Sequence, residues 1–220
     1  MRDMALLCSV NVGRPREAAW AGIGRTSIDK HAVTGPVAVE LLGLAGDQVS
    51  DTRHHGGPDK AVYAFAREDL DHWAQVLGEP IRDGQFGENL TTSGIDVNEA
   101  EIGERWRIGA DVVLEVASVR NPCNDFKMWM GRGGYDNTAW VKRFAAVGRP
   151  GPYLRVVVPG LIETGDDISV IHEPGHGVTV SMMFRALYTD ATLLPRLLEV
   201  DALTAEAHDK ASAYVANKIL

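Results

Sequence analysis

The segment 51–60 collects several side chains that could bind an anion or move a proton. It reads Asp-Thr-Arg-His-His-Gly-Gly-Pro-Asp-Lys and leads into an apolar run. Its glycine pair permits unusual backbone geometries and lets a ligand approach main-chain N–H groups closely. A plain tight turn with one buried structural histidine is the alternative interpretation. The candidate residues of this loop are Arg53, His54, His55, Gly56, Gly57, Asp59 and Lys60.

A second candidate is the thiol of Cys123, which follows a buried strand and a turn stiffened by Pro122. The sequence predicts a short helix directly after it. A cysteine at a helix N-terminus, beside the guanidinium of Arg120, is stabilised as the thiolate. A thiolate acts either as a nucleophile or as a soft metal ligand. An unreactive loop thiol is the alternative.

A third and weaker candidate is the run Gly87, Glu88 and Asn89, in which a permissive glycine precedes a carboxylate and an amide. The nucleophile elbow, the phosphate-binding P-loop and the His-Glu-x-x-His zinc motif are all absent from the sequence. Zinc held by His54, His55 and Cys123 is conceivable, although adjacent side chains of an extended segment point to opposite sides. A hydrolase that pairs Cys123 with one of the two histidines is the stronger general alternative.

Short strands and turns must position these groups. Runs of β-branched residues broken by Gly, Pro and Asp predict strands at 4–12, 36–39, 61–66, 104–108, 112–119, 153–159 and 167–171. Apolar periodicity with end signals predicts helices at 67–77, 125–130 and 139–147, the last capped by Asn137 or Thr138. Many short strands with few helices favour a sandwich or a barrel.

The pattern changes after a Pro- and Gly-containing linker at 173–177. Helical patterns follow at 181–188, 193–200 and 204–219. So few residues in three short helices would be marginally stable alone, so we expect them to dock on the main body. The sequence thus predicts two units, a β domain over 1–173 and a three-helix domain over 174–220.

Composition limits the classes of function. The chain has 220 residues, with 22 Lys and Arg against 30 Asp and Glu, for a net charge of −8. This balance argues against a dedicated nucleic-acid binder, which needs a concentrated basic surface. Two cysteines cannot make a disulfide scaffold or an all-cysteine metal cluster. No signal peptide or membrane-spanning run is recognisable, so we expect a cytoplasmic protein.

The motifs taken together resemble the MOSC domain, the module at the C-terminus of molybdenum-cofactor sulfurases, and within that superfamily the small YiiM-type proteins. The tail from about residue 177 is similar to the three-helix domain of that subfamily. No single motif is decisive, but their shared order is specific. The matching segments are DKHAVTGPV (29–37), GLAGD (43–47), HHGGPDKAV (54–62), FGENL (86–90), GERWRIG (103–109), RNPC (120–123) and GD (165–166).

The resemblance implies a largely antiparallel β-barrel whose loops bind a molybdenum–pterin cofactor, molybdopterin. Cys123 would supply a thiolate to molybdenum or carry sulfur. Related enzymes reduce N-hydroxylated compounds, including base analogues, with electrons from a separate flavin or iron–sulfur partner. The implied residues for the anionic arm are Lys30, Arg53, Lys60 and Arg120, assisted by the backbone of Gly56 and Gly57. Gly87 is also implied to bind the cofactor. Those implied to orient the pterin or move protons are His54, His55, Asp59, Glu88 and Asn89.

Two departures from the family pattern concern the substrate. Asn124 and Asp125 stand where some members carry an aromatic and a basic residue, and a glycine-rich insertion at 130–135 lies beside the expected site. The chain also lacks the aminotransferase-like half of a full sulfurase. The leading hypothesis is a cofactor-dependent reductase of N-hydroxylated compounds. A non-catalytic carrier of the cofactor or of sulfur, and a Cys–His hydrolase, are the alternatives.

Overall fold

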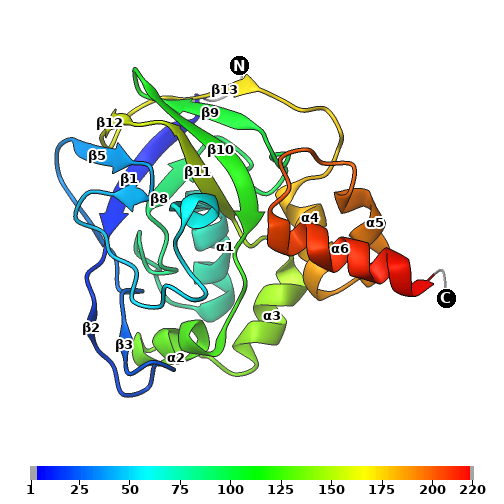
Figure 1. Cartoon of the computed structure of the whole chain (residues 1–220). Coiled ribbons are helices and arrows are strands. Elements are labelled where there is room, and N and C mark those ends of the chain that lie inside the picture. Colours follow the sequence, from blue (N-terminus) through cyan, green and yellow to red (C-terminus); the bar gives the residue numbers. More distant parts are fainter. Residues whose placement is uncertain (1–3, 219–220) are drawn as a thin grey trace.

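The computed structural model describes residues 4–218, and a mixed eight-stranded sheet forms its centre (Figure 1). The strands follow the order β13-β9-β10-β11-β7-β8-β1-β4. Their bounds are β1 Leu6–Val12, β4 His31–Ala32, β7 Val62–Ala66, β8 Leu90–Ser93, β9 Arg105–Ile108, β10 Val112–Val119, β11 Pro152–Val158 and β13 Ile168–His172.

Smaller sheets and helices surround this sheet. The strands of the two small sheets are β5 Val37–Glu40, β6 Gly43–Leu44 and β12 Gly160–Ile162 in one, and β2 Arg16–Glu17 and β3 Arg25–Thr26 in the other. The α-helices are α1 Arg67–Leu77, α2 Asn124–Arg132, α3 Trp140–Val147, α4 Val180–Tyr188, α5 Leu194–Leu197 and α6 Ala205–Lys218. Two 3₁₀ turns are η1 Pro58–Lys60 and η2 Ala191–Leu193.

The fold is therefore mixed α/β, and the predicted barrel is not confirmed. Every pair in the large sheet is antiparallel except β7 and β8, whose parallel pairing needs a crossover connection, here containing α1. No continuous ladder joins the first and last strands of the sheet within the described chain. One isolated β-bridge, between Leu6 and Asp167, and three backbone hydrogen bonds beside it link β1 to the residues around the start of β13.

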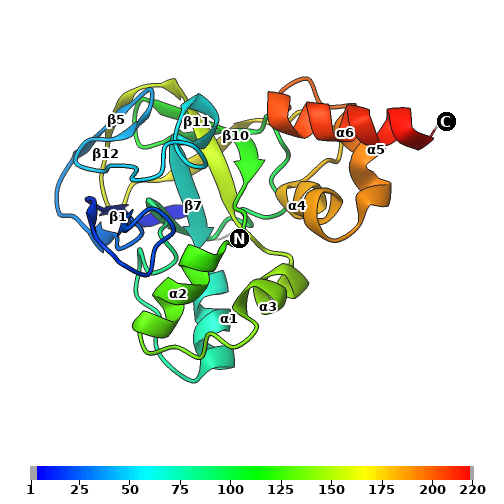
Figure 2. The same ribbon diagram turned by 60° about the horizontal axis from the view of Figure 1, so that its bottom comes forward.

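Two buried clusters hold the layers together. Figure 2 shows α1, α2 and α3 gathered at one end of the sheet, where an aromatic cluster forms around Trp73, Phe86, Phe126 and Trp140. The other cluster combines the sheet interior with residues of α4, α5 and α6. The C-terminal helices thus pack on the main body, as expected, while the division at 173/174 stays a prediction. No helix within residues 4–218 is both long and apolar enough to cross a bilayer.

Most predicted elements are present with shifted ends. The helix predicted at 125–130 extends through Gly131 to Arg132. The helix predicted to be capped by Asn137 or Thr138 instead begins after Ala139, which has a φ of 50° and makes no side-chain cap. The predicted helix at 193–200 is a 3₁₀ turn and the one-turn α5. The predicted end of the last helix at 219 lies outside the described residues.

Strand register brings the two candidate segments to one place. Ser118 of β10 pairs with Tyr153 of β11, which in turn pairs with Tyr63 of β7. Strand β7 therefore begins at the level where β10 ends. Because the segment 51–60 leads into β7 and Cys123 follows β10, both lie at the same level of the sheet, near the C-terminal end of β10.

Candidate functional site

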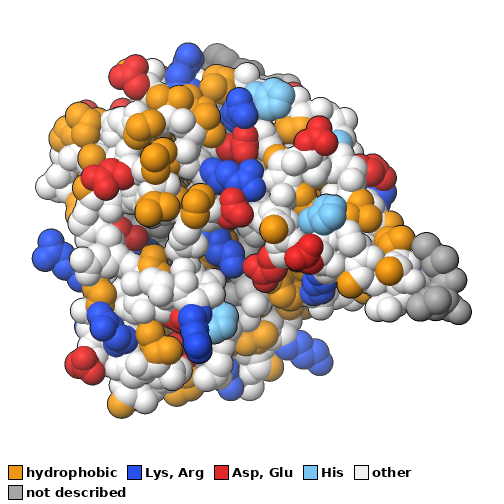
Figure 3. Space-filling model, viewed as in Figure 1, with side chains coloured by type: hydrophobic (Ala, Val, Ile, Leu, Met, Phe, Trp, Pro, Cys, Tyr) orange, Lys and Arg blue, Asp and Glu red, His pale blue; other side chains and the backbone are white. Residues whose placement is uncertain are grey.

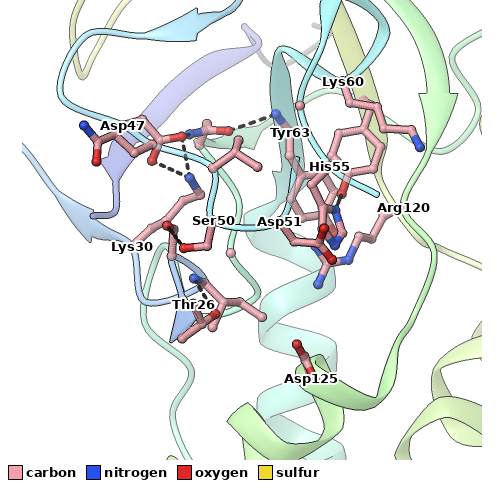
Figure 4. A pocket seen from close by; sticks show the side chains of 18 of the residues that line it. Thr26, Lys30, Asp47, Ser50, Asp51, His55, Lys60, Tyr63, Arg120 and Asp125 are labelled. Atoms are coloured by element: carbon pink, nitrogen blue, oxygen red, sulfur yellow. Dashed lines mark hydrogen bonds and ion pairs between the residues drawn. The ribbon is translucent and has the colours of Figure 1, made fainter. Parts of the chain in front are cut away.

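A cleft with an empty volume of about 770 Å³ lies at this end of the sheet, and we call it the first cleft. Its walls come from residues 25–30, 47–51, the loop before β7 and the segment after β10 (Figure 4). Segments far apart in sequence thus meet around one opening. The sequence-predicted residues that line it are Lys30, His55, Gly56, Lys60, Gly87, Asn89, Arg120 and Cys123.

Arg120 carries a buried positive charge at this cleft. Only 5% of the residue is exposed, and its guanidinium lies over the rings of Tyr63 and Phe126. Within residues 4–218 no carboxylate forms an ion pair with Arg120, and its Nε has no hydrogen-bond partner. A buried charge without a counter-ion is costly unless a ligand pairs with it. The arrangement therefore favours an anionic ligand.

Cys123 is the N-cap residue of α2, as predicted. Its Sγ accepts a hydrogen bond from the backbone N–H of Phe126 at 3.5 Å. The thiol is half-buried and lines the first cleft. The position can therefore present its sulfur to a ligand in the cleft.

His55 faces Arg120 and Tyr153 across the cleft. Its Nδ1 lies 3.3 Å from the Tyr153 hydroxyl. Burial, together with the positive charge of Arg120, lowers the pKa of His55 to about 4. The imidazole is consequently neutral at pH 7, and it can exchange a hydrogen bond with Tyr153 but adds no positive charge.

Lys30 reaches the same cleft already paired. Its Nζ forms an ion pair with Asp47, and burial lowers the pKa of Lys30 even so. The Asp47 carboxylate also accepts hydrogen bonds from the Gly13 N–H at 2.7 Å and the Asn89 amide at 2.9 Å. Because Asp47 neutralises it, Lys30 offers less free charge to an anion than Arg120 does.

Several predicted residues are engaged elsewhere. Glu88 is fully buried behind the cleft, where it accepts hydrogen bonds from the N–H groups of Gly84 and Phe86 and from the Thr91 hydroxyl. Burial raises the pKa of Glu88 to about 7. Asp59 accepts a 2.6 Å hydrogen bond from Arg155. Both carboxylates therefore support the loops that carry the site.

A second cleft, with an empty volume of about 1420 Å³, shares Cys123 with the first. Arg53 and His54 line only this cleft, and the Nδ1 of His54 lies 2.9 Å from Asp51. Its far wall comes from α4 and α6. Six residues line both clefts, namely Asp51, His55, Lys60, Cys123, Asp125 and Tyr153. Gly57 lines neither, but it precedes η1 with a φ of 81°.

The geometry weakens two alternatives raised by the sequence. Within the described chain no three His, Cys, Asp or Glu side chains cluster as a metal site, so zinc held by His54, His55 and Cys123 is not supported. The Cys123 Sγ accepts from Phe126 and forms no hydrogen bond to either histidine among residues 4–218. A Cys–His hydrolase therefore lacks its pre-formed nucleophile and base.

Sequence reasoning missed several residues of the site. Tyr63 and Tyr153 flank Arg120 and His55, although their strand patterns indicated only a sheet. The two carboxylate oxygens of Asp125 share one hydrogen bond from the Gly22 N–H, and Asp125 so holds the loop between β2 and β3 beside the cleft. The spacing of Tyr63 after the loop was visible in the sequence. No local sequence pattern indicates the contact between residues 22 and 125.

Comparison with known proteins places the chain in a family. The model of the MOSC domain matches residues 51–169. The Bacillus subtilis protein YflK is 30% identical over 200 residues, covering 89% of this chain and 88% of YflK. A Gibberella moniliformis protein named Reductase is 33% identical over 172 residues, covering 77% of this chain but 30% of that protein. Escherichia coli YiiM is 27% identical over 149 residues, 66% of this chain and 64% of YiiM.

Solved structures share the fold. The crystal structure of YiiM from Geobacillus stearothermophilus matches with a TM-score of 0.77 at 23% identity, covering 96% of this chain and 98% of that one. That of YiiM from Escherichia coli gives 0.74 at 21% identity, covering 99% and 96%. The family match includes the 51–60 loop, Arg120 and Cys123. The chain belongs to the MOSC domain family and is YiiM-like within it.

Proposed function

We propose that the first cleft binds the molybdenum cofactor, molybdopterin, and that the protein reduces N-hydroxylated compounds with Cys123 as the protein ligand to molybdenum. The observation that carries the proposal is the buried, unpaired guanidinium of Arg120 in the wall that also presents the Cys123 thiol. The guanidinium suits an anionic group, and the thiol suits a soft metal.

The residues present fit such a cofactor. Arg120 supplies an uncompensated positive charge, and Lys60 and the Gly56 backbone line the same cleft. Cys123 supplies one soft ligand, which suits a metal whose other ligands belong to its own organic group. When bound, the cofactor supplies two-electron redox chemistry at molybdenum. The MOSC family is associated with this cofactor, which makes the assignment consistent with the family match.

The side chains around Cys123 suit the reduction of an N–OH group to N–H. This reaction consumes two electrons and two protons and releases water. His55 stays neutral and holds a hydrogen bond with the Tyr153 hydroxyl, so a proton can be held at either His55 Nδ1 or Tyr153 Oη. The name Reductase of one relative supports a redox role.

Electrons must come from outside the chain. Among the described residues no cluster of metal-ligating side chains could hold an iron–sulfur centre, and the sequence has only two cysteines. We propose a separate flavin or iron–sulfur protein as the donor. We also propose a cytoplasmic protein whose partners are the cofactor and a small substrate, with no role for nucleic acid or a membrane.

The test is metal and pterin analysis of protein made in a host that synthesises the cofactor. We expect molybdenum and pterin to copurify with the wild type and with Cys8→Ala, the matched control, and molybdenum to be lost from Cys123→Ala. Wild-type protein without molybdenum or pterin, or Cys123→Ala with unchanged metal content, would contradict the proposal.

Turnover separates the enzyme from a carrier. Reduction of a hydroxylamino compound with an artificial electron donor would support the reductase. Stoichiometric cofactor without any turnover would instead identify a carrier of the cofactor or of sulfur. The hypothesis of a Cys–His hydrolase predicts hydrolysis without cofactor, which alkylation of Cys123 would abolish. The hydrogen bond of the Cys123 Sγ with the Phe126 N–H, and not with a histidine, does not favour this hypothesis.

A further inference from the structure

Two segments that lie far apart in the sequence, 13–28 and 124–135, form one surface, which we call the basic face. The first segment contains the β2–β3 hairpin and the second contains α2, and Figure 1 shows these elements next to one another. The rings of Trp20 and Trp129 stack with their centroids 6.5 Å apart. A hydrogen bond from the hairpin backbone to Asp125 joins the same two elements. The hairpin and the helix are therefore held together as a single surface.

Positive charge is concentrated on the basic face, although the protein as a whole is acidic. The face has five cationic side chains and two anionic ones, a net charge of +3, whereas the whole chain carries −8, so the remaining residues carry −11. The cationic residues are Arg14, Arg16, Arg25, Lys127 and Arg132, and the anionic ones are Glu17 and Asp125. Figure 3 shows basic side chains on the lower left of the molecule, where Figure 1 places β2, β3 and α2. Such an uneven distribution of charge attracts anionic partners to one side of the molecule.

Three of the five cations are available to a partner. Arg16 forms an ion pair with Asp29 at 2.7 Å. Arg14, Arg25 and Arg132 are exposed, and no ion pair within the described chain includes any of them. A guanidinium forms strong, often bidentate, hydrogen bonds with carboxylates. The basic face therefore suits a surface that is rich in Asp and Glu.

Apolar and aromatic side chains lie among these cations. Ile23, in the turn between β2 and β3, is 47% exposed, and Trp20 of the same hairpin is half-buried. The guanidinium carbon of Arg132 lies 6.0 Å from the centre of the Trp20 ring. Trp and Arg are among the residue types that contribute most to binding energy in protein interfaces. The face thus offers a protein partner both charge and apolar anchors, whereas a net charge of +3 on an acidic chain is little for nucleic acid.

The basic face adjoins the first cleft. Residues 25–28, at and after β3, and Asp125 of α2 line that cleft. Cys123 is the N-cap residue of the same helix α2 and lines the cleft as well. A protein seated on the basic face would therefore rest against the hairpin and the helix that form one wall of the first cleft. Its bound redox group would lie close to the sulfur of Cys123.

We propose that the basic face is the docking surface for a small acidic redox protein that delivers electrons to the first cleft. The reduced partner is oxidised and gives up two electrons, which with two protons from solvent convert N–OH into N–H and water. Opposite charges on the two proteins speed their encounter and set their orientation. The inference rests on the proposed function for the use of the electrons, whereas the docking depends on surface residues alone.

The first test is calorimetric titration of the cofactor-free protein with two acidic redox proteins, oxidised flavodoxin and a [2Fe–2S] ferredoxin. At physiological ionic strength, charges more than about 8 Å apart are largely screened, so local charges decide binding. We expect at least one of the two proteins to bind the wild type. Arg14→Glu combined with Arg132→Glu, which changes the net charge of the face from +3 to −1, should raise the Kd about tenfold.

The matched control combines Arg107→Glu with Arg185→Glu. These two arginines are exposed, lie in β9 and α4 outside the basic face, and give the same change in net charge. The control should bind as the wild type does. The proposal is overturned if neither redox protein binds the wild type, or if the two double variants bind equally well. A single-stranded oligonucleotide that binds the wild type more tightly than either redox protein also overturns it.

The second test compares electron donors in protein made in a host that synthesises the cofactor. With the redox protein that binds, in its reduced form, we expect the double variant of Arg14 and Arg132 to reduce a hydroxylamino compound about tenfold more slowly than the wild type. With reduced methyl viologen, a small donor that needs no docking surface, the two rates should be equal. Equal losses with both donors would overturn the proposal. If the wild type carries no cofactor and reduces nothing, the proposed function fails, while the titration still decides the docking surface.

Discussion

The guanidinium carbon of Arg120 lies 4.8 Å from the centre of the Phe126 ring. The Tyr63 ring stands at 5.3 Å from the same carbon. Aromatic faces attract a cation without neutralising it. The buried guanidinium is therefore held by rings and keeps its full charge for a ligand, in contrast to Lys30, which Asp47 already neutralises.

Arg120→Met tests this arrangement because methionine retains an unbranched apolar stem without charge. Burial of an unpaired charge costs several kcal/mol, whereas the cation–π contacts return about 2 kcal/mol. We expect the cofactor-free variant to be as stable as the wild type or up to ~2 kcal/mol more stable in urea denaturation. Bound pterin should fall strongly. A variant that is less stable by several kcal/mol but keeps its pterin would show that Arg120 is purely structural.

Cys123→Ser separates the helix cap from the thiolate. Serine is a strong N-cap residue, so its hydroxyl can accept from the Phe126 N–H in place of the sulfur. We expect the free energy of unfolding to stay the same or rise by about 0.5 kcal/mol. Molybdenum should nevertheless be lost, because an alcohol is a poor ligand for a soft metal site. Retained molybdenum in a well-folded Cys123→Ser protein would contradict the role of the thiolate.

Local signals in the sequence predicted many elements well. The helix at Arg67–Leu77 has acidic residues in its first turn and Gly78 in the left-handed conformation just after its end, and both of its predicted ends are correct. Strand β10, Val112–Val119, also has its predicted ends. The loop 51–60 and Cys123 were singled out by residue type, and strand register brings them to one cleft.

Long-range pairing carried no such signal. Strand β8 contains the polar residues Thr91 and Thr92, yet both are fully buried beside β7 and β1. Parallel pairing with β7 depends on the crossover through α1, which local patterns do not reveal. The sequence also could not show which cations are neutralised, because Lys30 and its partner Asp47 are separated in the sequence and meet only in the folded chain.

Asp47→Asn tests whether the ion pair with Lys30 supports the loops of the first cleft. The substitution leaves the buried ammonium without its counter-ion, which typically costs 3–5 kcal/mol. We expect a loss of about 3 kcal/mol in the free energy of unfolding. Lys30→Met should cost less, because the Asp47 carboxylate keeps its hydrogen bonds from Gly13 and Asn89. Equal losses in the two variants, measured by urea denaturation, would contradict this reasoning.

The shifted pKa values of Glu88 and His55 predict opposing dependences of stability on pH. The pKa of Glu88 is raised from its ordinary 4.5 to about 7, so the folded state binds that proton more tightly and loses stability as pH rises from 4.5 to 7. The pKa of His55 is lowered from 6.5 to about 4, so its contribution is present above pH 6.5 and is lost as pH falls to 4. Each shift corresponds to roughly 3 kcal/mol.

The contributions of Glu88 and His55 to stability change in opposite directions over nearly the same pH range. The free energy of unfolding of the wild type should therefore depend only weakly on pH. Removing one group should reveal the pH dependence that the other causes. We expect the free energy of unfolding of Glu88→Gln to rise with pH between 4 and 6.5, since His55 then acts alone. His55→Asn should show the reverse, a fall between pH 4.5 and 7. Urea denaturation of the three proteins at half-unit steps of pH measures both slopes. If both variants keep the wild-type dependence of stability on pH, burial does not shift the pKa values of Glu88 and His55 as argued. The surroundings of Glu88 would then be more open to water than its contacts with Gly84, Phe86 and Thr91 imply.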